Sequence, residues 1–451
     1  MYSEKLLSVL VAVPGVVVLM LSLSWLFGVA LAERTISRVT KAVYALLIVT
    51  AVLLVLSLWR GHVDSVTMFA GHWFTVGDYG FDVVLLADRL SVPFALLTVV
   101  LAGIVGAFSV RYLHRDPGFF RFFLLLHLFT LGSLLVFLAG SLDLLVAGWE
   151  LVGITSVLLV GFFQYRRDPV RNALRVFTTY RVADLCILIA IFVAHHSFGA
   201  ASWAAMFSGT WPEAENLMHG PAATVLAVLL VLAASGKSSQ GPFYGWLPRA
   251  MEGPTPSSAV FYGAISVHAG AYLLLRAEPL ILSSKVATVL LVTIGLGTAF
   301  LGTLVHRTCA DAKTSVAYAS QTQLGLIFAE IGFGWTTMAL VHITGHAVLR
   351  TLQFLRTPSM LRDYHRLHAA SGGNLDPTGS HYESILPARV QYWLYRFALG
   401  RGFYDSVVDR FVAAPVLMVA KLLGVFEPAA AAVPEVKAVE EKRSSVSVEI
   451  I

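Results

Sequence analysis

Long apolar runs follow one another along most of this sequence, separated by short polar segments. A helix needs about 20 mainly apolar residues to cross the hydrocarbon core of a bilayer. Only 13% of the residues are charged, where soluble domains carry about 25%, so the chain cannot cover a water-facing surface. We therefore expect an all-α polytopic membrane protein with eleven spanning helices. The expected spans are residues 6–32, 43–59, 90–112, 121–140, 142–164, 172–195, 222–251, 257–276, 285–305, 313–333 and 336–356.

Two segments depart from this simple pattern. The run 222–251 is too long for one straight crossing, and Gly236, Gly241 and Pro242 near its middle predict a broken helix. Residues 63–86 lie between the second and third spans, and apolar and polar side chains alternate there. That alternation predicts a small extramembrane β-hairpin.

Basic residues gather in every second loop between the spans, whereas the loop 197–221 has none. Cytoplasmic loops of membrane proteins carry an excess of lysine and arginine. We therefore expect the N-terminus outside and the C-terminus in the cytoplasm, which agrees with an odd number of spans. The basic residues in question are Arg34, Arg38, Lys41, Arg111, Arg115, Arg121, Arg166, Arg167, Arg171, Arg249, Arg307, Arg356, Arg362 and Arg366.

The sequence changes character after the last span. We expect a transmembrane domain over residues 1–366 and a linker over 367–384. Residues 385–426 carry apolar side chains at helical spacing, which predicts a cytoplasmic or interfacial amphipathic region. Residues 427–451 are expected to form a disordered tail. The helical spacing is carried by Phe403, Val407, Val408, Phe411 and Val412.

Charged side chains inside the spans are the strongest functional signal, because each costs at least about 2.5 kcal/mol at bilayer depth. Glu150 lies in an apolar stretch, and Lys237 lies at the expected helix break. Buried carboxylates and buried lysines can exchange protons, so we expect both residues to carry protons rather than to form a static ion pair. The other ionisable residues within the spans are Asp143, Arg181, Asp184, Lys313, Arg350, His127, His268, His342 and His346.

Spacing groups some of these residues. Arg181 and Asp184 are three apart on one helix, which predicts an ion pair that is either structural or tunes a neighbour. His342, His346 and Arg350 are spaced by four and share one helix face. No third ligand is apparent beside the two histidines, so a proton relay is favoured over a metal site.

Other ionisable residues have two interpretations. Lys313 lies near a helix end, where it could reach the membrane surface or join the proton path. His268 could be a relay group or a satisfied polar residue in the core. His195, His196 and His219 are expected to lie in loops.

Several functions are excluded by the sequence. It contains no Walker loop, Rossmann fingerprint, nucleophile elbow or haem-attachment motif. The formal charge of +5 forms no basic patch for nucleic acid. The two cysteines, Cys186 and Cys309, are too few for a disulfide framework or a cysteine metal site. The first apolar run ends in Ala30-Leu31-Ala32, which is typical of a signal-peptidase site, but a signal segment is shorter, so we expect a retained helix.

Three motifs resemble those of the antiporter-like subunits of respiratory complex I and of Mrp-type cation/proton antiporters. They are Gly148-Trp149-Glu150, Gly236-Lys237-Ser238-Ser239-Gln240 and Trp246-Leu247-Pro248-Arg249-Ala250-Met251-Glu252-Gly253-Pro254-Thr255-Pro256. The resemblance covers roughly residues 65–356 and implies a fold of two inverted five-helix repeats, each with one broken helix. It also implies that Glu150 and Lys237 form a proton-carrying pair, with Arg181 and Asp184 as a supporting ion pair.

The sequence departs from this family in places. Tyr262 stands where the family often has a histidine, and Arg350 where it usually has a lysine, although arginine cannot usefully release a proton. The chain turns polar after the eleventh span, so we expect a shortened second repeat without its broken helix. The expected proton path comprises Glu150, Lys237, Lys313, His342, His346, Arg350, His268 and Tyr262.

This shortened form and the segment 252–258 resemble the membrane subunits of bacterial inorganic-carbon accumulation systems. The resemblance implies a conductor of protons or another monovalent cation, not itself an enzyme, in the bacterial inner membrane. It would couple an ion gradient to CO₂ and bicarbonate uptake by a zinc-containing partner resembling a β-type carbonic anhydrase, with no cofactor in this chain. Two alternatives remain: a subunit of a multi-subunit cation/proton antiporter or redox-driven pump, and a non-conducting scaffold for a partner.

Overall fold

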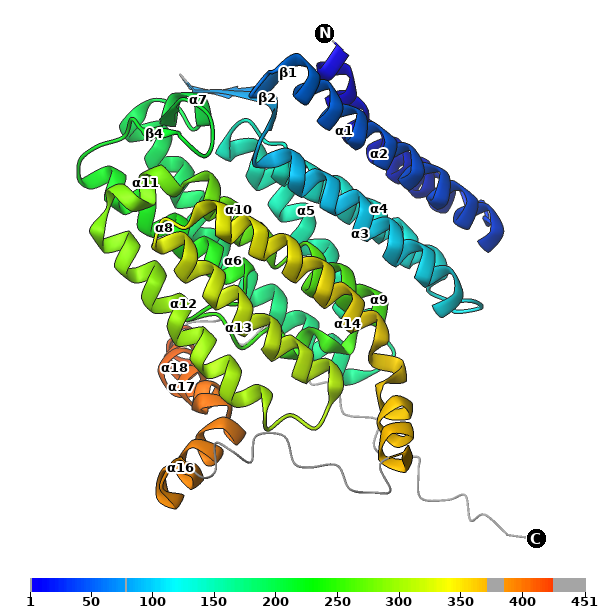
Figure 1. Ribbon diagram of the computed structural model, residues 1–451, viewed down its shortest axis with the longest axis vertical. Coiled ribbons are helices and arrows are strands. Elements are labelled where there is room, and N and C mark those ends of the chain that lie inside the picture. Colours follow the sequence, from blue (N-terminus) through cyan, green and yellow to red (C-terminus); the bar gives the residue numbers. More distant parts are fainter. Residues whose placement is uncertain (1, 78, 371–384, 425–451) are drawn as a thin grey trace. The chain divides into compact units, whose positions relative to one another are not determined.

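The computed structural model describes residues 2–77, 79–370 and 385–424. The chain forms two compact units, Met1–Gly402 and Phe403–Ile451. In the first unit the helices run side by side, with a two-stranded hairpin at one end (Figure 1). We call this end the hairpin end and the opposite end, which carries the basic loops, the basic end.

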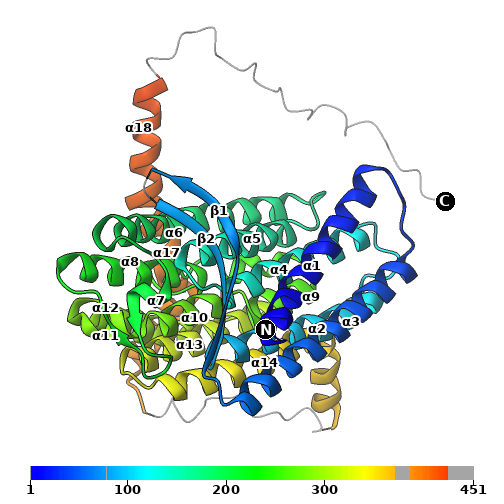
Figure 2. The same cartoon turned by 90° about the horizontal axis from the view of Figure 1, so that it is seen from above.

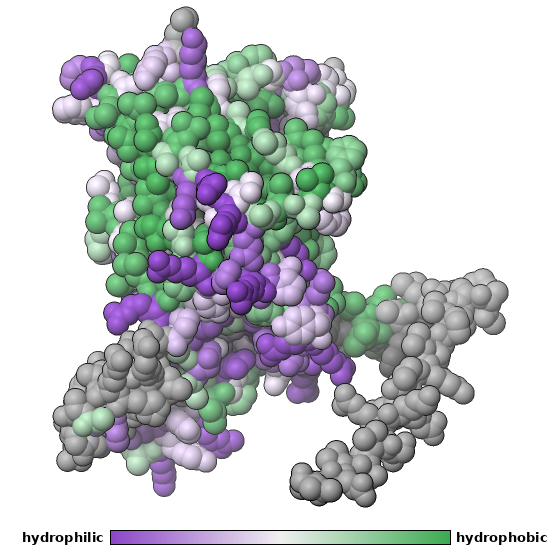
Figure 3. Space-filling view, turned by 90° about the vertical axis from the view of Figure 1, so that its right-hand side faces the viewer, coloured by the Kyte–Doolittle hydropathy of each residue, from purple (hydrophilic) through white to green (hydrophobic). Residues whose placement is uncertain are grey.

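Hydropathy located most of the helices, because an apolar run in lipid satisfies its backbone hydrogen bonds only as a helix. Among the described residues, eight helices are long and apolar enough to cross a membrane, one of them the composite segment Thr255–Arg276. Figure 3 shows hydrophobic side chains covering much of one face, with hydrophilic side chains concentrated toward one end. The other seven are α1 (Tyr2–Leu26), α2 (Glu33–Gly61), α3 (Ser91–Tyr112), α4 (Phe119–Phe137), α5 (Leu142–Val160), α6 (Arg167–Phe198) and α12 (Lys285–His306).

The break expected within 222–251 is confirmed. Helix α8 (Pro221–Lys237) ends at Lys237, and the chain then turns repeatedly before the 3-10 helix η1 (Pro248–Glu252). The residues after the break therefore do not form the second half of a straight helix. The next crossing is also irregular, although its apolar sequence predicted a continuous helix over residues 257–276. It consists of α9 (Thr255–Ser258), the π-helix η2 (Ala259–Ala264) and α10 (His268–Arg276).

The last two expected spans are α13 (Ala312–Gly332) and α14 (Thr336–Ala370). Helix α14 continues well past residue 356 and into the expected linker 367–384, so the predicted end of this helix is wrong. Leaving the apolar core does not end a helix when the next residues have good helix propensity. Residues 371–384 lie outside the described part of the chain.

The predicted hairpin is confirmed as β1 (Ser65–Val76) and β2 (Tyr79–Asp88), an antiparallel pair. Seen from above in Figure 2, the two strands lie over the ends of the helices. The base of the hairpin is tied to the connection between α4 and α5: the Gly140 amide donates to the Val84 carbonyl, 2.8 Å away. A Cβ atom at Gly140 would lie 2.9 Å from that oxygen, which explains why glycine is needed there.

Glycines allow the closest helix contacts. A Cβ atom at Gly148 of α5 would lie 2.6 Å from the Gly132 carbonyl oxygen of α4, and one at Gly295 of α12 would lie 2.5 Å from the Gly325 carbonyl oxygen of α13. These two helix pairs therefore pack backbone against backbone, as small residues allow in membranes. In Figure 1, α12, α13 and α14 form a layer in front of α5, α6 and α8.

The hairpin end also carries short connecting elements. The segment after α6 forms α7 (Trp203–Met206) and the strand pair β3 (Phe207–Ser208) and β4 (Glu215–Asn216). Helix α11 (Glu278–Ser283) follows α10 and touches β4 through a hydrogen bond of 3.0 Å from Asn216 to the Ser283 hydroxyl group.

The C-terminal region divides differently from the expectation. Helix α16 (Ala388–Leu399) belongs to the first unit and packs against α12, although the sequence placed it in the cytoplasmic region 385–426. The second unit contains α17 (Tyr404–Val408), the π-helix η4 (Asp409–Ala413) and α18 (Ala414–Gly424). Docking of this unit on a membrane or a partner stays a prediction. The predicted tail 427–451 lies outside the described residues.

Candidate functional site

Lys237 is the last residue of α8, at the point where the helix breaks. Its side chain is buried, and its ammonium group donates a hydrogen bond to the Trp149 carbonyl oxygen, 2.8 Å away. The ammonium nitrogen lies 4.8 Å from the ring centroid of Trp149 and 4.7 Å from that of Tyr180. Aromatic faces and a carbonyl group thus stabilise the cation directly, in place of a carboxylate contact.

The residues expected to break the helix shape this site. A Cβ atom at Gly236 would lie 2.1 Å from the Ala183 Cβ atom, so glycine lets α8 approach α6 closely. The Gly241 amide donates to the Thr298 hydroxyl oxygen of α12, 2.9 Å away, and Pro242 follows with no amide hydrogen to satisfy. The break therefore places Lys237 inside the helix bundle. The backbone amide of Gly241, after the break, finds its hydrogen-bond partner on another helix.

Arg181 of α6 lies between two carboxylates. The same guanidinium nitrogen, Nη2, donates to Glu150 of α5 and to Asp184, where the distance to Oδ2 is 2.7 Å. The other Asp184 oxygen accepts a hydrogen bond of 2.7 Å from the Trp149 indole nitrogen. Asp184 is buried, but 34% of the Glu150 side chain and 40% of the Arg181 side chain are exposed. A charged pair thus reaches the outer surface of two spanning helices.

Glu150 and Lys237 are connected indirectly. Among the described residues, Lys237 has no carboxylate oxygen within 4.0 Å, and Arg181 rather than Lys237 holds Glu150. Trp149 joins Lys237 to Asp184, because its carbonyl oxygen accepts from Lys237 and its indole donates to Asp184, and Arg181 joins Asp184 to Glu150. The expected pair is therefore a four-membered ion cluster in which Arg181 and Trp149 lie between the carboxylate and the lysine.

Tyr262 of η2 is linked to the Lys237 site through hydroxyl groups. Its hydroxyl group is 3.2 Å from the Ser156 hydroxyl group, which is 3.5 Å from that of Tyr180. Because the Tyr180 ring contacts the Lys237 ammonium, these hydroxyl groups form a short polar connection from η2 toward the lysine. The Trp246 ring packs against both tyrosines.

The histidines form an ordered chain. His268 Nδ1 donates to the Ala264 carbonyl oxygen at 2.8 Å, so its Nε2 is free to accept from His346 Nδ1, also at 2.8 Å. His346 Nε2 in turn accepts from Arg350 Nε at 3.3 Å. The hydrogen bonds thus all point from Arg350 toward His268. His268 is therefore a member of the histidine group and not an isolated core residue.

His342 lies one helical turn before His346, with 6.4 Å between the ring centroids. Its Nδ1 atom is 2.8 Å from Glu330 Oε1, and its Nε2 atom is 3.0 Å from Gln323 Oε1. Both Glu330 and Gln323 belong to α13. His342 therefore faces α13, whereas His346 faces the beginning of α10.

Lys313 lies apart from the histidines. Its ammonium group donates to the carbonyl oxygens of Met251 and Gly253, at 2.7 and 2.8 Å. It therefore satisfies carbonyl groups at the C-terminal end of η1, near the basic end of the bundle. These contacts link α13 to the segment after the helix break, and neither of them joins Lys313 to His342 or His346.

Sequence reasoning missed three pairings: Asp143 with His195, Glu330 with His342, and Asp88 with Arg276. His195 and His196 were expected in a loop, but α6 continues through both, and His195 Nε2 lies 3.0 Å from Asp143 Oδ1. His219 does lie in a loop. Glu330 was detectable as a carboxylate within an apolar run. The third pair, Asp88–Arg276, joins positions 188 residues apart and leaves no local signal.

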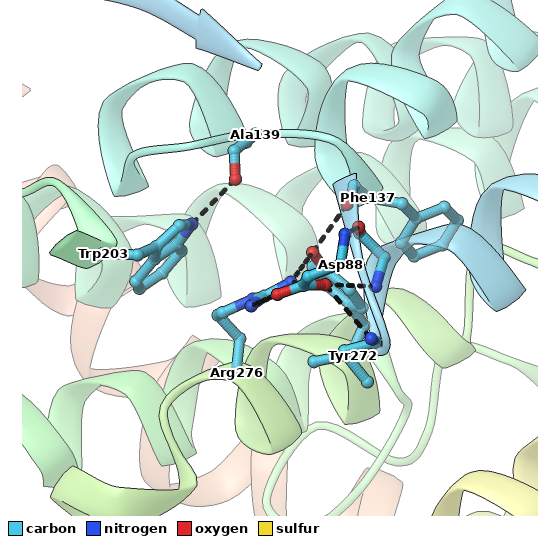
Figure 4. Close-up of polar contacts among 8 residues, drawn as sticks. Asp88, Phe137, Ala139, Trp203, Tyr272 and Arg276 are labelled. Atoms are coloured by element: carbon cyan, nitrogen blue, oxygen red, sulfur yellow. Dashed lines mark hydrogen bonds and ion pairs between the residues drawn. The ribbon is translucent and has the colours of Figure 1, made fainter. Parts of the chain in front are cut away.

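The Asp88–Arg276 pair is drawn in Figure 4. Arg276 contacts both oxygens of Asp88, at 2.5 and 2.9 Å, and also donates to the Tyr272 hydroxyl group at 3.1 Å. The Tyr272 hydroxyl group donates to the Phe137 carbonyl oxygen at 2.6 Å. Burial works against the Asp88 carboxylate, but the Arg276 guanidinium and hydrogen bonds from Ser91 outweigh it and lower the pKa of Asp88. The pair fastens the hairpin to α4 and α10.

The described part of the chain contains no group of three His, Cys, Asp or Glu side chains placed to hold a metal ion. What it does contain is a series of ionisable groups buried across a membrane bundle, arranged around one broken helix. Fold and site together define a multi-pass helical membrane protein of the class that buries ionisable groups around a broken helix.

Comparison with known proteins gives the family. Residues 139–375 match the family described as NADH:quinone oxidoreductase/Mrp antiporter, TM. Residues 73–123 match the N-terminus of NADH-ubiquinone oxidoreductase (complex I) chain 5. The chain belongs to the NADH:quinone oxidoreductase/Mrp antiporter family, as its motifs indicated.

Relatives within the family differ in function. The chain is 34% identical over 280 residues to a probable inorganic carbon transporter subunit, DabB1, of Halothiobacillus neapolitanus, covering 62% of this chain and 50% of that protein. It is 31% identical over 356 residues to NADH-ubiquinone oxidoreductase chain 5 of Cryptococcus neoformans, covering 77% of this chain and 52% of that protein. The chain thus spans about half the length of the curated relatives it matches.

Solved structures give the same fold. The Mrp complex from Dietzia sp. DQ12-45-1b has a chain with a TM-score of 0.65 and 26% identity, covering 78% of this chain and 37% of that one. A chain of the membrane-bound sulfane sulfur reductase, an archaeal respiratory membrane complex, also has a TM-score of 0.65 at 18% identity, covering 77% of this chain and 70% of that one. At this identity the second likeness concerns the fold alone.

Proposed function

We propose that this chain is a proton-conducting membrane subunit that couples an ion gradient to inorganic carbon uptake by a partner. The observation that carries the proposal is the cluster of Glu150, Arg181, Asp184 and Lys237 around Trp149. Ionisable groups at bilayer depth are too costly to keep without a role. The choice of inorganic carbon rests on the likeness to DabB1.

The cluster supports a stepwise transfer. A proton arriving on Glu150 neutralises the carboxylate, so Arg181 shifts its hydrogen bonding toward Asp184. Asp184 then interacts less strongly with the Lys237 ammonium, and the lysine is held mainly by Trp149 and the two aromatic rings. Lys237 becomes the easiest group to deprotonate, because burial favours its neutral form once the nearby negative charge is compensated.

The next groups lie toward α10 and α14. Ser238, directly after Lys237, donates to the Val267 carbonyl oxygen at 2.6 Å, which brings the break in α8 beside the beginning of α10. His268 follows Val267 and begins the histidine chain. Tyr262 supplies a second polar connection through Ser156 and Tyr180. A proton leaving Lys237 therefore has polar groups on two sides.

The exposed part of the cluster supports a partner subunit. Glu150 and Arg181 reach the surface of α5 and α6 at a level where lipid cannot hydrate them. Another protein surface with polar groups there would satisfy both side chains. In our proposal the partner is a DabA-like subunit resembling a zinc-containing carbonic anhydrase, which carries out the chemistry while this chain acts as a transporter subunit and not as an enzyme.

The energetics permit this coupling in a bacterial inner membrane. Accumulating bicarbonate a hundredfold costs about 2.7 kcal/mol, at about 1.4 kcal/mol per tenfold. One proton crossing about 150 mV releases about 3.5 kcal/mol. One proton per turnover is therefore sufficient. With the N-terminus outside and the C-terminus in the cytoplasm, the basic end faces the cytoplasm and protons enter from the hairpin end.

The test removes one titratable group at a time. Glu150→Gln and Lys237→Ala should each abolish growth in ambient air that depends on this chain, and each should lower proton flux into liposomes by about tenfold or more. Glu150→Asp should keep part of the activity, because it retains a carboxylate. Glu215→Gln and Lys285→Ala change the same charges at exposed positions and serve as controls.

The outcomes separate the alternatives. Full growth and full flux in both Glu150→Gln and Lys237→Ala would leave the chain as a scaffold. Lost flux in a strain whose growth does not depend on inorganic carbon would favour an antiporter or a redox-driven pump. Zinc analysis and mass spectrometry of the proteins that co-purify with the chain test the partner directly.

A further inference from the structure

We propose that Glu330, to which His342 donates a hydrogen bond, is where protons enter or leave the histidine group on the side of the hairpin; the His342 ring lies 6.4 Å from the His346 ring, centroid to centroid. This inference rests on the proton-conducting function proposed above and adds a residue to it. Glu330 lies two residues before the end of α13, and the connection to α14 that follows includes the exposed side chains of Phe333 and Trp335. Glu330 itself is buried, close in sequence to these exposed side chains.

The bonding of Glu330 is incomplete. Oε1 accepts a hydrogen bond from His342 at 2.8 Å, whereas Oε2 is buried and has no hydrogen-bond partner within the described residues. A buried carboxylate oxygen without a partner costs about 1–3 kcal/mol or more. A purely structural carboxylate would be expected to satisfy both oxygens. A carboxyl group that takes up a proton, or binds a water molecule on its way, needs one oxygen available.

Gln323 allows His342 to hold either charge state. When His342 is protonated, both ring nitrogens donate, one to Glu330 and one to the Gln323 amide oxygen, as the distances of 2.8 and 3.0 Å permit. When His342 is neutral, rotation of the amide group presents its NH₂ group to the unprotonated nitrogen. The proton can therefore move between His342 and Glu330 along one hydrogen bond, with rotation of one amide as the only other change.

Arg350 closes the histidine group at His346. Arg350 donates to His346, to the Gln353 side-chain oxygen at 2.6 Å and to the Ala319 carbonyl oxygen at 3.0 Å. Arginine does not lose its proton in proteins, so the chain cannot pass a proton through Arg350. Of Arg350 and Glu330, which lie beside His346 and His342 respectively, only Glu330 can both bind and release a proton.

The neighbouring carboxylate provides a matched control. Glu278 begins α11 at the same end of the bundle and accepts a hydrogen bond from Thr336, the first residue of α14. Burial raises the pKa of Glu278, and the Thr336 hydrogen bond partly offsets that effect. It is thus a second buried carboxyl group in the same region, and within the described part of the chain its side chain bonds to Thr336 rather than to the histidines.

The experiment uses the full chain with its co-purifying subunits, reconstituted into liposomes with a pH-sensitive dye inside. Glu330→Gln should lower proton flux by about tenfold or more, Glu330→Asp should recover part of it, and Glu278→Gln should stay within about twofold of the wild type. Wild-type flux in Glu330→Gln, with flux lost in Glu150→Gln, would overturn this inference and leave the proposed function standing. Wild-type flux in both would overturn both.

A second measurement does not depend on how the variants fold. Hydrophobic carbodiimides modify carboxyl groups that take up protons in apolar surroundings, and peptide mass spectrometry identifies the modified residue. In the wild-type protein we expect modification of Glu330, accompanied by loss of flux in proportion to the modified fraction. An unmodified Glu330 under conditions that modify Glu150 would overturn the assignment.

Discussion

Two charge clusters in this molecule contain the same kinds of side chain and differ in almost every other respect. In the Asp88–Arg276 pair, both carboxylate oxygens are bound, and only 4% and 5% of the two side chains are exposed. In the Glu150 cluster, one nitrogen of Arg181 is shared between two carboxylates, and more than a third of the arginine is exposed.

The two clusters differ in whether a charged side chain has an alternative hydrogen-bond partner. Asp88 is fixed from three directions: Arg276 and the amides of Leu90 and Ser91 donate to its carboxylate, and its own backbone amide donates to the Ser91 hydroxyl oxygen at 2.8 Å. Asp88 and Ser91 thus each accept, through the side chain, a hydrogen bond from the other's backbone amide just before α3 begins. Arg181, by contrast, can give up one carboxylate and keep the other. The first cluster therefore holds the fold, whereas for the second we propose a change of charge during transport.

The largest effect is expected from breaking the fixed pair. Arg276→Met leaves Asp88 buried and unpaired, and such a change typically costs about 3–5 kcal/mol. We expect a marked loss of thermal stability in detergent and poor yield. Arg89→Met is the matched control, because Arg89 pairs with Asp64 at 2.7 Å with both side chains 56% exposed, and exposed pairs contribute about 0–1 kcal/mol. Equal stability losses in the two variants would show that the buried Asp88–Arg276 pair contributes no more to the fold than an exposed pair does.

Much of the fold could be predicted from the sequence. Hydropathy located the helices because lipid allows few alternatives, and Gly236, Gly241 and Pro242 marked the break in α8. Glu150 and Lys237 stood out because their charges are costly in an apolar run. The family motifs then brought together segments far apart in the chain.

The features that could not be predicted from the sequence depend on contacts between distant segments. The π-helix η2 lies in an apolar run without a distinctive local pattern, and α14 exceeds its apolar stretch. The role of Arg181 as the partner of Glu150 depends on the packing of α5 against α6. Asp88 and Arg276 each looked like ordinary residues near a helix end, and only the fold brings them together.

A smaller effect is expected from acid. The pKa of Asp88 is lowered in the folded protein, so its contribution to stability is complete above the unfolded value of about 3.9 and is lost as the pH falls through the lower folded value. Each unit of that lowering corresponds to about 1.4 kcal/mol.

Thermal unfolding measured from pH 7 down to pH 3 should therefore show a decline in the wild type that is shallower in Asp88→Asn, which keeps a side-chain acceptor for the α3 amides. The exposed control Asp64→Asn should follow the wild-type curve. Parallel curves for the wild type and Asp88→Asn would mean that Arg276 does not favour the charged form of Asp88.

The smallest effect on stability, and a selective one on transport, is expected at Gly153. A Cβ atom there would lie 3.1 Å from the Lys237 ammonium nitrogen, 3.7 Å from the Tyr180 ring and 3.8 Å from Arg181 Nη2. Gly153→Ala therefore fills the space between the two cations. Because the end of a lysine side chain can shift, we expect stability to change by less than about 1 kcal/mol, with the higher helix propensity of alanine offsetting the crowding. The shifted ammonium loses its alignment with the Trp149 carbonyl oxygen, so proton flux should fall several-fold.

Gly297→Ala in α12 is the control, since nothing lies within 4 Å of its Cβ position. This variant should gain stability and keep full flux. Equal flux in the two variants would show that the space beside Lys237 is not needed for proton transfer. In that case the Glu150 cluster would not depend on the freedom of Lys237 to move.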